Sequence, residues 1–338
     1  MNVLILGGTG LLGSQGAKEL IARGHHVKTL ARRAPSRDAD IPAEMEIIPG
    51  NFMNMSDDEM REQFRGCEGF VFAAGIDERV EGPAPVYDMF KKFNIDPTDR
   101  LLRLAKECGV KHAVICGSCF SYSDRTCPEM KLYETHPYIR SRRDQETVAM
   151  SYADENFDVA VLELSYIFGA QPGRRPVWVF MVESIRSMKG ATMWPRGGTA
   201  MVTTRQVGQA IAGALERNRG GNCYPIGWFN LTWKEMLKIF HKHLGCPDKK
   251  IITIPDWMYA IAGMGIKRDQ KKRGIEGGLD MVKYTKLQCS NQFMDRNLGC
   301  VPLGVTDDDI DAAIGESVRL CVAILDGTAG EVKNMKGD

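Results

Sequence analysis

The chain has 338 residues and a formal net charge of +1 at neutral pH; 43% of its residues are hydrophobic and 26% are charged. This length allows one large or two ordinary domains with a sizeable core, and the composition is typical of a soluble globular protein. The near-zero net charge speaks against nucleic acid as a partner. No apolar run approaches the roughly 20 residues that a membrane span needs, so we expect no membrane partner.

Ten cysteines are scattered along the chain, mostly inside apolar segments such as those around Cys108 and Cys321. This distribution indicates buried thiols in a reducing compartment and therefore a cytoplasmic protein. Cys116 and Cys119 have the spacing of a redox motif. They lack a second cysteine pair and a thioredoxin-like context, so we interpret the spacing as a coincidence and expect no metal site.

The chain begins with a short apolar run, residues 3–6, followed by a glycine-rich turn and a stretch with helical periodicity, residues 11–22. Glycine lets the main chain approach a pyrophosphate, and a helix that starts here directs free N–H groups at the phosphates. A second strand expected at residues 26–31 completes the context in which such a turn indicates dinucleotide binding. We therefore predict cofactor contacts from the turn, at Gly7, Thr9, Gly10, Leu11, Leu12 and Gly13.

The Gly-x-x-Gly-x-x-Gly spacing, headed by Gly-Gly-Thr, resembles the extended short-chain dehydrogenase/reductases, a family of NAD-dependent epimerase/dehydratase-like enzymes and carbonyl reductases. Alternating strands and helices across the first 165 residues separately predict an α/β fold with a doubly wound parallel sheet of the Rossmann type. We expect a dinucleotide-binding domain in residues 1–168 and a smaller C-terminal α/β substrate lobe in residues 169–338. A segment near residues 199–227 is expected to return to the Rossmann sheet.

Arg32 and Arg33 follow the second predicted strand, where an acidic residue would favour NAD, and the next acid is Asp38. Two guanidinium groups suit a 2′-phosphate, so we predict NADP as the cofactor, with NAD as the alternative. The other interpretation is a pair of solvated surface arginines. The resemblance implies further cofactor contacts after the third strand, after the fourth strand and in the following helix, at Asn51, Phe52, Ala73, Ala74, Gly75 and Asn94.

Hydride transfer at a carbonyl or alcohol needs a proton donor or acceptor beside the reacting oxygen. In the family, a tyrosine and a lysine four residues apart on one helix face serve this step, and a serine or threonine holds the substrate oxygen. The resemblance assigns these roles to Ser118 and Tyr138, with Arg142 in place of the lysine. Arginine keeps the positive charge that lowers a tyrosine pKa, but it cannot relay a proton. Tyr87 and Lys91 have the same spacing in a place where the family has no catalytic helix, so we interpret them as a coincidence.

The second half of the chain is rich in aromatic and methionine side chains, among them Trp178, Met181, Trp257 and Met258. We expect most of them to pack in a core, while some line an apolar pocket that suits a hydrophobic carbonyl substrate. The basic run at residues 267–273 is interpreted as a solvated face, with an anionic substrate group or RNA as the alternative.

The sequence therefore predicts an NADP-preferring oxidoreductase of the carbonyl reductase or alcohol dehydrogenase type. Cys119 and Phe120 follow Ser118, where sugar dehydratases of the family carry an acid pair, so dehydration is disfavoured. One alternative is a nucleotide-sugar epimerase. Because Arg142 stands in place of the family lysine, a second alternative is a non-catalytic relative that senses a dinucleotide or binds RNA. The resemblance also implies a homodimer through the helices around Asn94 and Tyr138.

Overall fold

A computed structural model describes residues 1–35, 39–330 and 332, so Asp38 lies outside the described residues. Its main feature is a parallel seven-stranded sheet in the order β11-β7-β6-β4-β1-β2-β3. The strand order runs outward from β1 in both directions, which is the doubly wound arrangement and confirms the predicted fold class. The strands are β1 (Asn2–Leu6), β2 (His26–Ala31), β3 (Glu46–Pro49), β4 (Gly69–Phe72), β6 (His112–Cys116), β7 (Asp158–Leu164) and β11 (Gly221–Ile226).

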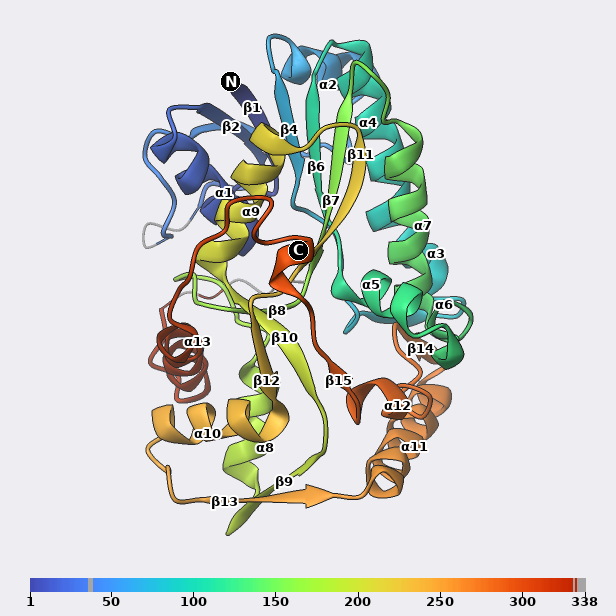
Figure 1. Cartoon of the computed structure of the whole chain (residues 1–338), viewed down its shortest axis with the longest axis vertical. Helices are drawn as coiled ribbons and strands as arrows, with labels where there is room; N and C mark the ends of the chain where they lie inside the picture. Colours follow the sequence, from blue (N-terminus) through green and yellow to red (C-terminus); the bar gives the residue numbers. More distant parts are fainter. Residues whose placement is uncertain (36–38, 331, 333–338) are drawn as a thin grey trace.

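Helices cover both faces of this sheet (Figure 1), and alternate residues of each strand supply the two cores. In β1, Val3 and Ile5 join one core, whereas Leu4 and Leu6 join the other. Burial on both faces explains why this strand is a continuous apolar run in the sequence. One face carries α1 (Leu11–Ala22) and α9 (Thr204–Arg217), and the other carries α2 (Asp57–Phe64), α4 (Asp96–Glu107) and α7 (Pro137–Ser151).

A second lobe is built around a smaller sheet in which β10 lies between β12 and β15 and also pairs with β8. Its core contains Phe168, Trp178 and Met181, in agreement with the expectation that Trp178 and Met181 are packed inside. The chain then returns to the first lobe, since α9 packs on α1 and β11 pairs with β7. The lobe comprises β8 (Tyr166–Phe168), α8 (Val179–Ser187), β10 (Gly198–Thr203), β12 (Phe229–Thr232), α10 (Trp233–His243), β15 (Asn291–Gln292) and α13 (Ile310–Leu325).

At the end of this lobe far from the N-terminus, β9 and β13 form a two-stranded parallel ribbon that leads into α11 (Figure 1). The remaining elements include this ribbon, α11 and several short helices and strands. These elements are β5 (Glu81–Pro83), α3 (Tyr87–Phe90), the π-helix η1 (Lys91–Ile95), α5 (Cys119–Thr126), η2 (Pro128–Met130), α6 (Leu132–Thr135), β9 (Ala191–Pro195), β13 (Lys250–Ile254), α11 (Asp256–Arg273), β14 (Ile275–Gly277), α12 (Thr285–Gln288) and η3 (Arg296–Leu298).

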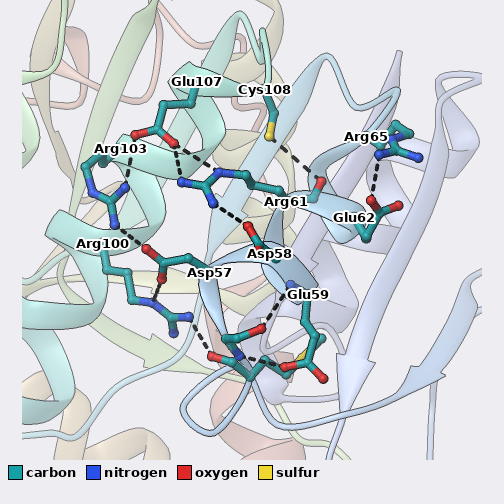
Figure 2. A network of polar contacts seen from close by, with 12 residues as sticks. Asp57, Asp58, Glu59, Arg61, Glu62, Arg65, Arg100, Arg103, Glu107 and Cys108 are labelled. Atoms are coloured by element: carbon teal, nitrogen blue, oxygen red, sulfur yellow. Dashed lines mark hydrogen bonds and ion pairs between the residues drawn. The ribbon is translucent and has the colours of Figure 1, made fainter.

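A network of charged contacts joins α2 to α4 (Figure 2). Asp57 accepts hydrogen bonds from Arg100 Nε and Arg103 Nη2, each at 2.7 Å, and these contacts lower the pKa of Asp57 to about 2. Arg100 also donates to the carbonyl oxygens of Phe52 (2.9 Å) and Met55 (2.6 Å). The network therefore fixes the loop after β3, where the adenine end of a dinucleotide is expected.

Candidate active site

The glycine-rich turn joins β1 to α1 in a geometry that requires glycine. Gly7 has a φ of +93°, and a Cβ added to Gly13 would lie 2.3 Å from the Gly7 carbonyl oxygen. Gly10 is the N-cap of α1 and has no side chain to bond the N–H groups of the first helical turn. Those donors, with the part-buried residues Thr9, Leu11 and Leu12 around them, fit the pyrophosphate of a dinucleotide.

Arg174 contacts this turn from a distant part of the chain, and the charge of Arg32 acts on it. Arg32 and Arg33 are exposed after β2, and Arg174 donates from Nε to the carbonyl oxygen of Thr9 at 3.1 Å. Burial and then the positive charge of Arg32 lower the pKa of Arg174. Gln171 also donates to the Thr9 carbonyl oxygen, at 3.3 Å. The sequence did not point to Arg174, because no motif marks it and it lies far from Arg32 along the chain.

The loops after β3 and β4 form the adjoining wall. Asn51 Oδ1 accepts from the backbone N–H of Met53 at 3.1 Å, which closes the turn after β3. Phe52 packs edge to face on Phe72, with ring centroids 5.9 Å apart. Ala73 and Ala74 are part-buried at the end of β4, and a Cβ on Gly75 would lie 2.6 Å from Asn94 Oδ1.

Asn94 is fully buried and holds the backbone of this turn. Its Oδ1 accepts from the N–H of Ile76 at 2.9 Å, and its Nδ2 donates to the carbonyl oxygen of Ile76 at 3.1 Å. Asn94 lies on the π-helical turn η1, a feature that occurs frequently at functional sites. The structure therefore shows that Asn94 holds the turn after β4, and its contact with a cofactor stays a prediction.

Helix α7 presents Tyr138 and Arg142 on one face, four residues apart. Arg142 Nε donates to the Tyr138 hydroxyl oxygen at 3.0 Å. The other guanidinium nitrogens donate to Gln145 Oε1 at 2.8 Å and to the carbonyl oxygen of Ile76 at 3.2 Å. Arg142 thus ties the phenol directly to the turn after β4.

Gln145 extends this contact into a buried network. Its Nε2 donates to the carbonyl oxygen of Asn94 at 3.0 Å and to Thr98 Oγ1 at 2.9 Å. Thr98 in turn donates to the same Asn94 carbonyl oxygen at 2.7 Å. The arginine that replaces the family lysine is therefore held rigidly by side chains that no motif identifies.

Ser118 is the N-cap of α5, and its Oγ accepts from the N–H of Phe120 at 3.4 Å. Burial raises the pKa of Tyr138, although the charge of Arg142 and hydrogen bonds with Ser118 and Arg142 oppose this effect. The sequence correctly indicated that the charge of Arg142 lowers the pKa of Tyr138, but it could not show that burial raises this pKa by more. At neutral pH the Tyr138 hydroxyl therefore retains its proton and can act as a proton donor.

The surroundings of Tyr138 are largely aromatic. Its ring centroid lies 5.4 Å from that of Phe90 and 6.0 Å from that of Phe120, and the Phe120 centroid lies 6.1 Å from that of Tyr284. Besides Arg142, Glu78 in the loop after β4 is charged, and after burial its charge contributes to the raised pKa of Tyr138. Burial and then the charge of the adjacent Asp77 raise the pKa of Glu78 itself. Sequence reasoning missed Glu78, which belongs to no motif.

Other kinds of site are not apparent in the part of the chain that the structure describes. All ten cysteines are free thiols, and burial raises the pKa of Cys116 and of Cys119 to about 12. Among the described residues, no three His, Cys, Asp or Glu side chains are grouped so that they could hold a metal ion. No helix within the described ranges is long and apolar enough to cross a membrane.

A buried pair of carboxyl groups lies behind the site, between β7 and α7. Glu163 is fully buried and accepts from Arg125 Nη2 at 2.5 Å. Glu146 accepts from Arg125 Nη1 at 2.7 Å and from Arg143 Nη1 at 2.9 Å. Burial and then the charge of Glu146 raise the pKa of Glu163 to about 8. Glu163 therefore holds a proton in the folded protein at neutral pH.

We expect a Glu163→Gln variant to change how stability depends on pH. The pKa of Glu163 is about 8 in the folded state against an ordinary value of 4.5, so between these values the unfolded chain binds fewer protons here. The contribution of Glu163 to the free energy of unfolding thus falls with rising pH, by at most about 1.4 kcal/mol per pH unit. Glutamine removes this slope, so the variant should gain stability relative to the wild type between pH 5 and pH 8.

Urea unfolding at several pH values measures this difference, and the exposed Glu134→Gln variant is the matched control. If wild type and Glu163→Gln kept the same difference in unfolding free energy at every pH, the raised pKa of Glu163 would be contradicted.

This chain is similar to known proteins in sequence and in fold. The model of the NAD dependent epimerase/dehydratase family matches residues 3–224. A putative dihydroflavonol 4-reductase of Synechocystis sp. is 21% identical over 333 residues, which cover 93% of this chain and 93% of the relative. Vestitone reductase of Medicago sativa is 25% identical over 317 residues, covering 84% of this chain and 92% of the relative. UDP-glucose 4-epimerase from Bifidobacterium longum, solved in complex with NAD+ and UDP, is similar in fold with a TM-score of 0.66 at 14% identity, covering 97% of this chain and 99% of that chain.

Proposed function

Because the chain belongs to the NAD dependent epimerase/dehydratase family, whose members are NAD(P)-dependent oxidoreductases and epimerases, we propose that it interconverts a carbonyl compound and the corresponding alcohol. The observation that carries the proposal is the contact between Arg142 Nε and the Tyr138 hydroxyl, at 3.0 Å on one face of α7. A buried phenol with a fixed cation beside it can donate a proton and tolerate the negative charge that remains.

In this mechanism the nicotinamide cofactor, when bound, supplies or accepts the hydride. Ser118 and Tyr138 bind the substrate oxygen through their hydroxyl groups. Tyr138 donates its proton to that oxygen as negative charge develops on it, and Arg142 stabilises the phenolate left behind. Arginine does not deprotonate, so the proton on Tyr138 must be restored by solvent rather than through Arg142.

We further propose that NADP is preferred over NAD. Support comes from Arg32 and Arg174, whose guanidinium groups are close enough beside the glycine turn for the charge of Arg32 to lower the pKa of Arg174. Cations whose charges repel each other are stabilised by an anion that binds both, and the 2′-phosphate of NADP is such an anion. The aromatic side chains around Tyr138 support an apolar carbonyl substrate.

A nucleotide-sugar epimerase is the second candidate, since the same tyrosine could serve a transient oxidation and a similar solved structure holds NAD+ and UDP. Such an enzyme keeps its cofactor through the cycle, so purification with stoichiometric dinucleotide would favour it. We also propose a cytoplasmic location, supported by the ten free thiols. The homodimer implied by the resemblance stays a prediction.

Titration calorimetry with NADPH and NADH tests the cofactor proposal. Loss of one charge-assisted contact costs about 1.5–3 kcal/mol, so Arg32→Ala and Arg174→Ala should each weaken NADPH binding about 10-fold to 150-fold. NADH binding should change little in Arg32→Ala, because NADH lacks the 2′-phosphate. Arg174→Ala also removes the contact with the Thr9 carbonyl oxygen, so it should weaken NADPH binding more than NADH binding. Arg65→Ala, which removes an exposed arginine at the C-cap of α2, is the matched control. NADH binding equal to or tighter than NADPH binding would overturn the NADP preference and favour the epimerase.

A further inference from the structure

Helix α11 projects from the second lobe. Of its 18 residues, all of them described, only Gly263 is buried. Trp257 is 63% exposed, Ile261 55% and Met264 54%, which is unusual for side chains this large and apolar. Trp257 and Met258 are exceptions to the expectation that most of these side chains pack in a core, because this helix contacts the rest of the protein along its other face.

The exposed apolar side chains form a stripe that continues into basic residues. Trp257, Ile261, Met264 and Arg268 are separated by four, three and four residues, so they lie on one face of the helix. We call this face the outer stripe; it comprises Trp257, Ile261, Met264, Arg268, Lys271 and Lys272.

The cations of the outer stripe differ from the other basic residues of α11. Lys267 Nζ lies 2.6 Å from the Asp280 carboxylate, and Arg273 Nε lies 2.7 Å from the Asp269 carboxylate. Among the residues that the structure describes, the three cations of the outer stripe have no carboxylate within ion-pair distance. Their charges therefore remain available to an external anion.

The inner face of the same helix approaches the catalytic candidates. Tyr259 is part-buried, and burial raises its pKa to about 12. Burial raises the pKa of Tyr166 and of Tyr284, with a smaller contribution from Tyr259, and Tyr284 packs on Phe120 beside Tyr138. One side of α11 thus faces the aromatic surroundings of Tyr138, and the other side carries the outer stripe.

We propose that α11 is a membrane-contact helix that lies on the surface of a bilayer containing anionic lipids. Its apolar half enters the boundary between headgroups and acyl chains, and its three unpaired cations bind lipid phosphates. A tryptophan beside methionine and isoleucine suits this boundary, because the indole has an apolar body and a polar N–H. The contact is peripheral, and it does not depend on the proposed reaction.

A second copy of the chain fits the outer stripe less well. A two-fold contact places the same surface on both partners, and the outer stripe contains cations but no carboxylate. Such a contact would leave the cations without partners, whereas an anionic bilayer neutralises them.

Sedimentation of the full chain with sucrose-loaded vesicles tests the proposal. We expect binding to vesicles of phosphatidylcholine with 30% phosphatidylglycerol, weak binding to phosphatidylcholine alone, and release at high salt, which screens the charges. Replacing Arg268, Lys271 and Lys272 by serine one at a time should weaken binding about fivefold each. Trp257→Ser and Ile261→Ser should also weaken it, whereas Leu298→Ser, at an exposed apolar residue of η3, should not.

Absence of binding to the anionic vesicles would overturn the proposal, as would equal binding to both vesicle compositions. Analytical ultracentrifugation tests the alternative that a second copy of the chain covers the outer stripe. A dimer that dissociates in Trp257→Ser and Ile261→Ser would assign the outer stripe to a second copy instead. Circular dichroism of each variant confirms that a loss of binding does not reflect unfolding.

Discussion

A Tyr138→Phe variant should lose carbonyl reduction by about 10²-fold to 10⁴-fold while binding NADPH as the wild type does. The phenyl ring keeps the packing on Phe90 and Phe120, so only the hydroxyl is lost. Without it, only the Ser118 hydroxyl remains on the substrate oxygen, with no phenol to donate a proton, and Arg142 cannot replace Tyr138 because arginine does not release a proton. Oxidation of NADPH by a panel of apolar aldehydes and ketones measures turnover, and calorimetry measures cofactor binding.

Tyr87→Phe is the matched control for this experiment. Tyr87 has the same Tyr-x-x-x-Lys spacing, but its hydroxyl donates to Asp144 of α7, whereas the Tyr138 hydroxyl accepts from Arg142. This variant should keep its turnover. If Tyr138→Phe also kept its turnover, Tyr138 would not be the acid/base, and the proposed mechanism would fail whatever the cofactor.

The parts of this protein that the sequence predicts well are those decided by neighbouring residues. The glycine turn is one of them, because the glycine spacing predicts a tight turn, and the structure has a positive φ at Gly7 with Gly13 close to the Gly7 carbonyl oxygen. The helix predicted at residues 11–22 is observed as α1 with the same bounds. The parallel sheet follows from the alternation of apolar runs and helical stretches, since both faces of such strands are buried.

The parts that the sequence could not predict depend on contacts between distant segments. Arg174 reaches Thr9 only because the second lobe lies over the glycine turn. Gln145 acquires its role from Asn94, on a different helix. Trp257 is a further example, because hydrophobicity alone does not tell whether a helix face packs on the core. Burial, which sets the pKa of Tyr138, is likewise a property of the assembled fold.

The second large effect is expected at Arg142. Arg142→Met keeps the aliphatic stem of the side chain but removes the charge and all three hydrogen bonds to Tyr138, Gln145 and Ile76. The carbonyl oxygen of Ile76 keeps its bond from Asn94, whereas Gln145 Oε1 loses its donor inside the core. An unsatisfied buried acceptor costs about 1–3 kcal/mol, so the free energy of unfolding should fall by that amount.

Arg142→Met should also change the pH dependence of catalysis, because the charge of Arg142 lowers the pKa of Tyr138. In alcohol oxidation Tyr138 must first lose its proton, so the rate rises with pH through this pKa. Without the charge the pKa rises further, and the rise in rate moves to higher pH. Arg142→Lys keeps a charge without the other two contacts, and we expect it to shift the profile less than Arg142→Met does.

A double variant separates the two roles of Arg142. Arg142→Met with Gln145→Leu removes both partners of the buried bond, and the Asn94 carbonyl oxygen keeps its hydrogen bond from Thr98. Replacing both partners of a hydrogen bond by apolar groups is nearly neutral, so stability in urea should recover. The pH profile of alcohol oxidation should stay shifted, because the charge is still absent. Recovery of stability together with a normal pH profile would show that Arg142 acts on the fold and not on Tyr138.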